Sequence, residues 1–215
     1  MPDVVLTIGA DRYDGWQSIR VQRSIEQVYG SFSLGVSDRW AAAIPARAVA
    51  AGDACRIDID GETVITGYVD DVTPHYNADS HDLTINGRDA AGDLVDCSAI
   101  HGTGQWTNQR LERIATDLCR PFGVAVTKDT DTGEPFAQFA LQEGEAVYEA
   151  LERLARQRGV LLVSDGRGNL VITRAGSVRI ATELARGVNL LEASGAFVMT
   201  DRYQEITVKG QSALG

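Results

Sequence analysis

The sequence predicts an α+β fold that is predominantly antiparallel β, with the strands first and a small two-helix α+β domain after them. Three observations predict this class. Residues 4–86 contain several short runs in which apolar and polar side chains alternate, which is typical of half-buried antiparallel strands. Between residues 107 and 158 the apolar spacing changes twice to the i, i+3, i+4, i+7 pattern of an amphipathic helix. The chain also has 22 glycines and only 5 prolines, which favours turn-rich β-structure over a helical bundle.

The stretch from Trp16 to Ser37 has the clearest alternation and predicts a long two-stranded ribbon. The apolar parity of its second half holds Val28, Phe32, Leu34 and Val36. The polar parity holds Tyr29, Ser31, Ser33, Gly35 and Ser37. In the first half Ile19 and Val21 alternate with Arg20 and Gln22, and residues 24–27 connect the two strands. Such a ribbon has one face that must pack on a core and one polar face that is available to a partner.

The other N-terminal strands are shorter. Residues 4–8 form the first of them. A strand at 55–59 runs into Asp60-Gly61, which suits a type I′ hairpin turn because Gly accepts a positive φ. The chain returns at 63–72, where Gly67 is a candidate β-bulge.

Two segments among these strands lose the alternation. Residues 38–52 predict a loop or a short helical turn, and residues 74–80 predict a polar loop. Residues 82–86 then alternate again. The six strands up to residue 88 are enough for a small antiparallel barrel or a sandwich.

Two amphipathic helices follow. Thr107 is the predicted N-cap of a helix at 108–120, and Gly159 is the predicted C-cap of a helix at 145–158. Further strands are predicted at 124–127, 160–163 and 170–172, so that the two helices pack on a small sheet. Residues 188–210 show two more strand-like runs, which are marginal unless they pair with a larger sheet.

The composition excludes several classes of protein. With 20 basic and 30 acidic residues the net charge is −10, so no basic stripe offsets repulsion from a nucleic-acid backbone. The N-terminus lacks the regions of a secretory signal, and no apolar run approaches the ~20 residues of a membrane helix. Cys55, Cys97 and Cys119 are too few for a disulfide framework and are expected to be buried free thiols.

No residue pattern predicts a catalytic site, so the chain is not expected to be an enzyme, and no cofactor or metal is expected. Asp129–Gly133 is similar to the start of a calcium loop, but the twelfth position is Ala140 rather than a bidentate Glu. His75, His81 and His101 lack the spacing of metal ligands and are expected at the surface. Glu143 and Glu145 are interpreted as charges at a helix N-terminus rather than as the carboxylate pair of a glycosidase.

A resemblance to one family extends along the whole chain. The segments that carry it lie at residues 23–26, 67–70, 87–98, 102–106, 151–155, 163–170 and 203–211. The most specific segment, GRDAAGDLVDCS at 87–98, closely resembles the baseplate hub protein of Mu-like contractile-tailed bacteriophages. The resemblance implies a structural virion protein of the viral tail, without an enzymatic step.

The resemblance also implies an architecture. Hub proteins of this family are homotrimers in which each subunit supplies two tube-forming β-barrels, so that six near-equivalent barrels join the central spike to the tail tube and let DNA pass. It implies a first barrel at residues 1–95, an accessory α+β domain at 96–187 and the initial strands of a second β-barrel at 188–215. Because the family's second barrel is longer than this last segment, the chain is expected to be truncated.

The implied partners are further copies of the chain, the tail tube protein, the central spike protein and other baseplate proteins. DNA is expected to pass transiently without specific binding, and no membrane insertion is expected. The implied location is the tail baseplate of the virion, with assembly in the host cytoplasm. The polar parity of the ribbon is expected to form part of the tube wall or an inter-subunit surface, at Arg20, Gln22, Glu26, Tyr29, Ser31, Ser33 and Ser37.

Two other functions remain open from the sequence. One is a cell-wall-binding or peptidoglycan-degrading tail protein, in which residues 100–175 would contact the cell wall. The other is the hub of a tailocin or a related contractile injection system instead of an infectious phage.

Overall fold

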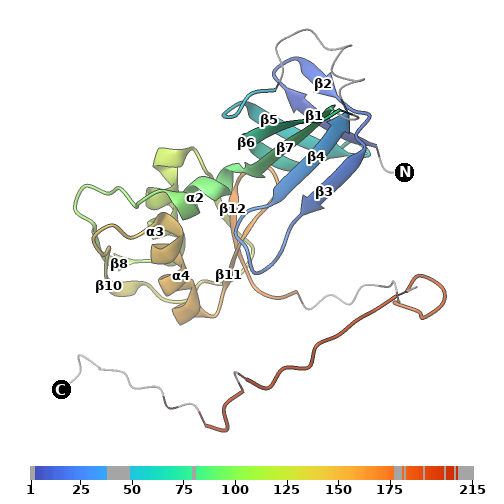
Figure 1. The fold of residues 1–215 in the computed structure, drawn as a ribbon. Coiled ribbons are helices and arrows are strands. Elements are labelled where there is room, and N and C mark those ends of the chain that lie inside the picture. Colours follow the sequence, from blue (N-terminus) through green and yellow to red (C-terminus); the bar gives the residue numbers. More distant parts are fainter. Residues whose placement is uncertain are drawn as a thin grey trace. The chain divides into compact units, whose positions relative to one another are not determined.

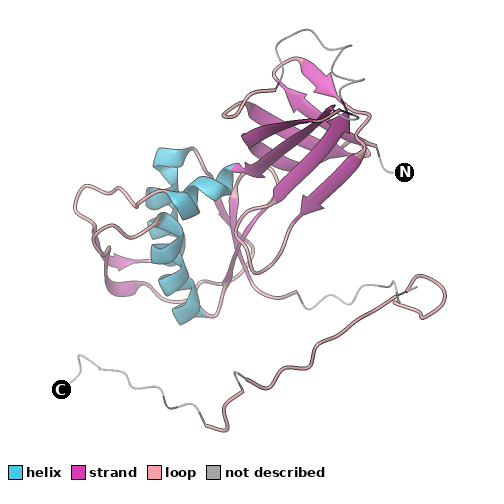
Figure 2. Ribbon diagram, viewed as in Figure 1, coloured by secondary structure: helices cyan, strands magenta, loops and turns pink. Residues whose placement is uncertain are grey.

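The computed structural model describes residues 3–37, 49–78, 81–176, 181, 183–190, 192–200, 202–205 and 207. The chain divides into two compact units, residues 1–175 and residues 176–215. The first unit holds the helices and strands of the described residues, and Figures 1 and 2 show their arrangement.

The N-terminal part of the first unit is a seven-stranded antiparallel sheet that curls into a half-barrel (Figure 1). Its strands lie in the order β2-β1-β5-β6-β7-β4-β3. Their bounds are Val4–Ile8 for β1, Asp11–Tyr13 for β2, Ser18–Gln22 for β3, Ser31–Ser37 for β4, Ala54–Ile59 for β5, Glu62–Tyr76 for β6 and His81–Asp89 for β7. The predominantly antiparallel β fold is therefore confirmed. The extra strand β2 has only three residues, too few for alternation to mark it.

One face of this sheet carries its core. In β4 the burial alternates residue by residue, because Phe32, Leu34 and Val36 are buried and the positions between them are only partly buried. The register sets Val21 of β3 opposite Phe32 and Ile19 opposite Leu34, as the period of two requires. Other buried members of this core are Val4, Leu6, Tyr13, Val49, Cys55, Ile57, Ile65, Val69 and Ile85. The ribbon predicted within residues 16–37 is present, with one apolar and one polar face.

The β5–β6 connection confirms the predicted hairpin turn, since Asp60 and Gly61 have φ values of 51° and 83°. The predicted bulge at Gly67 is wrong. The register shifts instead between Ile57 and Asp58 in β5 and between Val69 and Asp71 in β6. Gly67 is required for another reason: a Cβ there would lie 2.0 Å from the carbonyl oxygen of Arg88 on β7.

The strand β6 is longer than its sequence suggests. Residues 74–76, predicted as part of a loop, continue the strand, and His75 pairs with Asp82 of β7. Local alternation fails there because these residues are exposed on both faces, so neither face has to be apolar. Of the loop predicted at 38–52, residues 38–48 lie outside the described residues.

The second part of the first unit builds a separate core from short helices and strands (Figure 2). After the 3₁₀ turn η1 (Ala90–Gly92) come α2 (Asp93–Asp96), β8 (Gln105–Gln109), α3 (Leu111–Cys119), the 3₁₀ turn η2 (Arg120–Phe122), β9 (Val126–Lys128), β10 (Phe136–Ala140), α4 (Val147–Arg158), β11 (Leu161–Ser164) and β12 (Leu170–Thr173). The strands form a β10-β8 pair and a β11-β12-β9 sheet, in which β12 and β9 are parallel. We refer to this part as the helical part of the unit.

Both predicted helices are present, but they begin later than predicted. Residues 105–109 pair with β10, so α3 begins at Leu111 with Arg110 as N-cap instead of Thr107. Pairing with a distant strand decides the conformation of this stretch. The other helix, α4, begins at Val147, where the Glu149 side chain accepts a hydrogen bond of 3.0 Å from the Ala146 N–H. Its predicted C-cap Gly159 is confirmed by a left-handed conformation with φ 59°.

The second unit differs from the sequence expectation. The predicted strands at 188–210 are absent from its described residues, which contain one isolated bridge between Arg186 and Leu190. Apolar side chains there are exposed, Phe197 and Tyr203 among them. A strand that pairs with no sheet leaves its backbone donors and acceptors to water, which explains why the pattern alone does not produce a strand.

The three cysteines are free thiols. Cys55 and Cys119 are buried free thiols, as predicted, and burial raises the pKa of each to about 12. Cys97 is also free but only partly buried. Within the described ranges, no helix is both long and apolar enough to span a membrane.

Candidate functional site

The polar parity of the ribbon belongs to a larger polar face that crosses four strands. The registers of β3 on β4, β4 on β7 and β7 on β6 place side chains in rows on this face. One row is Gln22, Ser31, Arg88 and Tyr68. The next row is Arg20, Ser33, Asn86 and Asp71. We call this surface the polar face.

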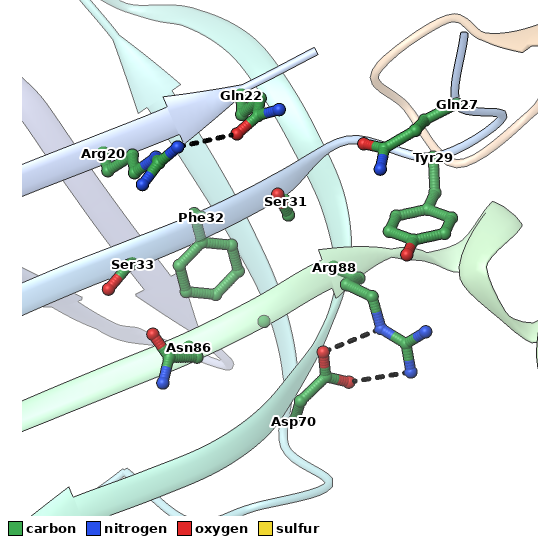
Figure 3. Close-up of a pocket in the computed structure, with 11 residues that line it drawn as sticks. Arg20, Gln22, Gln27, Tyr29, Ser31, Phe32, Ser33, Asp70, Asn86 and Arg88 are labelled. Atoms are coloured by element: carbon green, nitrogen blue, oxygen red, sulfur yellow. Dashed lines mark hydrogen bonds and ion pairs between the residues drawn. The ribbon is translucent and has the colours of Figure 1, made fainter. Parts of the chain in front are cut away.

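The polar face contains an open concavity of about 360 Å³ (Figure 3). Five of the seven residues predicted for the tube wall or inter-subunit surface line it: Arg20, Gln22, Tyr29, Ser31 and Ser33. Two do not. Glu26 lies in the exposed turn between β3 and β4, and Ser37 lies at the end of β4 opposite Asp82.

The lining residues that lie outside the ribbon were not predicted for this site from the sequence. Asn86 and Arg88 on β7 and Asp70 on β6 lie more than thirty positions from the ribbon, and nothing in their local pattern links them to it. The β4–β7 register brings Asn86 and Arg88 there, because it sets Ser33 opposite Asn86 and Ser31 opposite Arg88. The pairing of β6 with β7 adds Asp70. The alternating runs of the two strands predict two faces but not which strands are neighbours.

Arg88 is held by two carboxylates. Its Nε donates to Asp70 over 2.8 Å and its Nη2 donates to Asp96 over 2.7 Å. The hydrogen bond to Asp96, together with Asp70, raises the pKa of the guanidinium above its usual value and outweighs partial desolvation. The guanidinium also lies 5.3 Å from the centre of the Tyr29 ring, as a cation–π contact. The charge of Arg88 is therefore compensated, and its side chain holds Tyr29 in place.

Arg20 has a different environment. Its Nη2 donates to the Gln22 side-chain oxygen over 3.3 Å, and no carboxylate of the described residues pairs with it (Figure 3). The side chains of Gln27, Tyr29, Ser31 and Ser33 make no hydrogen bond to any described residue. The concavity thus holds one compensated and one uncompensated guanidinium, together with several free hydrogen-bonding groups.

The polar face is joined to the helical part by the turn between β3 and β4. Val28, predicted on the apolar parity of the ribbon, is 2% exposed and packs in the core of the helical part instead of the sheet core. The Gly30 N–H donates to Asp89 Oδ2 over 2.7 Å, and Arg23 donates to the Ser164 carbonyl oxygen. Burial raises the pKa of Asp89, while hydrogen bonds from the Gly30 and Ala91 N–H groups oppose that rise. The turn between β3 and β4 therefore connects the core of the sheet with the core of the helical part.

The other candidate residues have structural partners. In the turn at 129–133, Thr132 donates to Glu112 over 2.5 Å and the Gly133 N–H donates to Asp131 over 3.0 Å. Glu145 is buried and bound by Arg153 at 2.6 Å, whereas Glu143 is exposed, so the two carboxylates do not face a common cavity.

The structure describes the side chains of two of the three histidines. His75 is exposed, and His101 stacks on Trp106 with 4.2 Å between ring centres. The His81 side chain lies outside the described residues. Across the part of the chain that the structure describes, no group of three or more His, Cys, Asp or Glu residues is placed to hold a metal ion.

The fold is that of phage tail proteins. The 43 kDa tail protein of prophage MuSo2 from Shewanella oneidensis is similar, with a TM-score of 0.87 and 44% identity over 94% of this chain and 63% of that protein. A tail protein from Neisseria meningitidis MC58 shares the fold with a TM-score of 0.69 and 24% identity, over 80% of this chain and 50% of that protein.

The sequence matches two families of baseplate proteins. Residues 91–174 match the family model of the second domain of gp44-like baseplate hub proteins, and residues 3–89 match the N-terminal model of Mu phage baseplate assembly protein GpP-like sequences. Baseplate hub protein gp44 of Escherichia phage Mu is 42% identical over 214 residues, which are 95% of this chain and 55% of that protein. The predicted resemblance to the baseplate hub proteins of Mu-like phages is therefore confirmed. The chain spans about half the length of that curated relative.

Proposed function

We propose that the chain is a structural component of the baseplate hub of a contractile phage tail. In this proposal the full-length protein forms a trimeric, pseudo-sixfold ring that joins the tail tube to the central spike and lets DNA pass. The observation that carries it is the polar face itself, a broad β surface without a metal or acid–base centre in its concavity, held by a second core. The 42% identity to a protein named as a baseplate hub supports it.

The domain boundaries belong to the same proposal. Residues 1–95 would be the first tube-forming barrel, 96–187 the accessory domain and 188–215 the initial strands of a second barrel. The change from the sheet core to the core of the helical part near residue 90 supports the first boundary. The two family matches, which meet between residues 89 and 91, support it too.

The polar face would serve as tube wall or as an inter-subunit surface. Its partners would be further copies of the chain, the tube and spike proteins and other baseplate proteins. The net charge of −10 is consistent with a passage that repels DNA phosphates instead of binding them. We place the protein in the tail baseplate of the virion, assembled in the host cytoplasm.

We propose no catalytic step. The alternative of a peptidoglycan-degrading tail protein requires two carboxylates that flank a shared cavity. Glu143 and Glu145, the two candidates for that role, do not flank a shared cavity. Glu145 is buried in an ion pair with Arg153, and Glu143 is exposed. A zymogram on purified cell wall checks this directly, and clearing of the wall would contradict the proposal.

The decisive experiment is a gene deletion that tests whether contractile tails assemble. Deletion of the encoding gene from its phage or prophage should yield particles that lack a joined tube and spike, and the gene supplied in trans should restore them. Electron microscopy of the full-length protein along its symmetry axis should show a ring with six similar lobes. Complete contractile tails in the deletion strain would rule out a hub.

A further inference from the structure

We propose that the polar face is a contact surface between copies of this chain, in which the concavity at Arg20 receives a carboxylate side chain of a second copy. This inference rests on the proposed hub function and adds to it the residue at the contact, Arg20, and the chemical group that Arg20 binds.

The two arginines of the concavity differ in their partners. Arg88 is satisfied within its own chain by Asp70 and Asp96. Arg20 is exposed, and its one partner among the described residues is Gln22, over 3.3 Å. A guanidinium presents five N–H donors in a fixed planar fork, which matches the two oxygens of a carboxylate. Most of the donors of Arg20 are thus available to a partner.

Further hydrogen-bond donors surround the Arg20 guanidinium. Ser33 lies directly opposite Arg20 in the register, and Ser31 lies opposite Gln22. Their hydroxyls, like that of Tyr29, have no partner among the described residues. A carboxylate can accept about four hydrogen bonds. The concavity therefore offers an incoming carboxylate several donors besides Arg20, on a face fixed by the strand register.

The composition of the polar face favours a protein as the partner. The polar face carries Arg20, Tyr29, Arg88 and Tyr68, and Tyr68 is 42% exposed. Tyr and Arg are enriched at protein–protein interfaces. A nucleic acid fits less well, because Asp70 and Asp71 lie on the same face and the chain carries 30 acidic against 20 basic residues.

The charge balance of the chain favours a second copy as the partner. A chain with a net charge of −10 has carboxylates in excess, and exposed ones such as Asp11, Asp14 and Glu143 have no ion pair with described residues. The same chain therefore supplies both the uncompensated guanidinium and the carboxylates. A surface that meets a different patch of an identical neighbour produces a closed ring when the rotation closes.

The test uses a lysine as a chemical probe. In Arg20→Lys, the introduced amine can be joined to a touching carboxylate by a zero-length carbodiimide cross-linker. An equimolar mixture of isotopically labelled and unlabelled copies should then give cross-links at position 20 that join one labelled and one unlabelled chain. Arg12→Lys is the matched control, because Arg12 is also exposed but lies on β2 at the other edge of the sheet.

Charge reversal gives the second measurement. Sedimentation of the wild-type chain should show concentration-dependent assembly. Arg20→Glu should raise the dissociation constant of this assembly at least about tenfold, because two carboxylates would then face each other in the contact. Arg12→Glu should leave it unchanged. Equal effects of the two variants, or a wild-type chain that stays monomeric at all concentrations, would overturn the inference. Retention of duplex DNA by the wild type that Arg20→Glu abolishes would also overturn it.

The two proposals fail in different ways. If tails need the protein but Arg20 variants assemble normally, the hub function stands and this contact surface is wrong. If complete tails form without the protein, the hub function itself fails.

Discussion

At the scale of single residues, Asp89 fastens the sheet to the turn that enters the helical part. Its two carboxyl oxygens both accept from backbone N–H groups, Oδ2 from Gly30 at 2.7 Å and Oδ1 from Ala91 at 3.1 Å. Asp89→Asn should lower the free energy of unfolding by about 1–3 kcal/mol, because the new amide nitrogen must face one of these donors. Urea denaturation measures this. Asp14→Asn, at an exposed position, should change nothing; an equal loss in both variants would contradict the explanation.

Glu112 predicts a dependence of stability on pH. Burial pushes its pKa up, but hydrogen bonds from Lys128 and Thr132 outweigh this and lower the pKa to about 2. A carboxyl group with a depressed folded-state pKa stabilises the protein above its unfolded pKa and loses that contribution as the pH falls through the folded value.

Glu112→Gln should therefore cost about 1 kcal/mol at pH 7, a value discounted for partial exposure, and the difference should disappear between about pH 4.5 and pH 2. Denaturation curves at pH 7, 4 and 2.5 test this. The control is Glu143→Gln, whose side chain is exposed and unpaired among the described residues. A cost that stays constant with pH would show that packing, not charge, is lost.

At the scale of elements, the contact of β6 with β7 depends on Gly67. A Cβ at this position would lie 2.0 Å from the Arg88 carbonyl oxygen and 2.5 Å from the Asp89 Cα, both backbone atoms that cannot turn aside. Gly67→Ala should thus separate the strands and cost at least about 2 kcal/mol in urea denaturation. Gly102→Ala is the control, because no atom lies within 4 Å of its Cβ position. Similar stability of the two variants would contradict this steric account.

Some helices and strands of this protein follow from the local sequence pattern, and others do not. The strand β4 and the turn at Asp60-Gly61 were predictable because local pattern, burial and turn geometry agree there. The start of α3 was not, since β10, about thirty residues away, takes 105–109 as a strand. The same limit applies to the site. The ribbon residues follow from alternation, whereas Arg88 enters through the β4–β7 register, which alternation does not encode.

At the scale of the first unit, two cores are built from one chain that crosses between them more than once. The turn between β3 and β4 leaves the sheet, inserts Val28 into the core of the helical part and returns to β4. In the helical part, Gly166 lies in the hairpin between β11 and β12. A Cβ on Gly166 would lie 2.6 Å from the Val64 carbonyl oxygen of β6, so this hairpin approaches the sheet closely. The polar face and the helical part should therefore behave as one mechanical body.

Val28→Asp tests this coupling, because it would place a charge in an apolar core. It should lower the free energy of unfolding by at least about 3 kcal/mol and raise amide hydrogen exchange in both β4 and α4. Ile25→Asp is a matched control, since Ile25 lies in the same turn but is 73% exposed. If Val28→Asp raised exchange in α4 alone, the two cores would be independent, and the helical part could not hold the polar face in position for a neighbouring subunit.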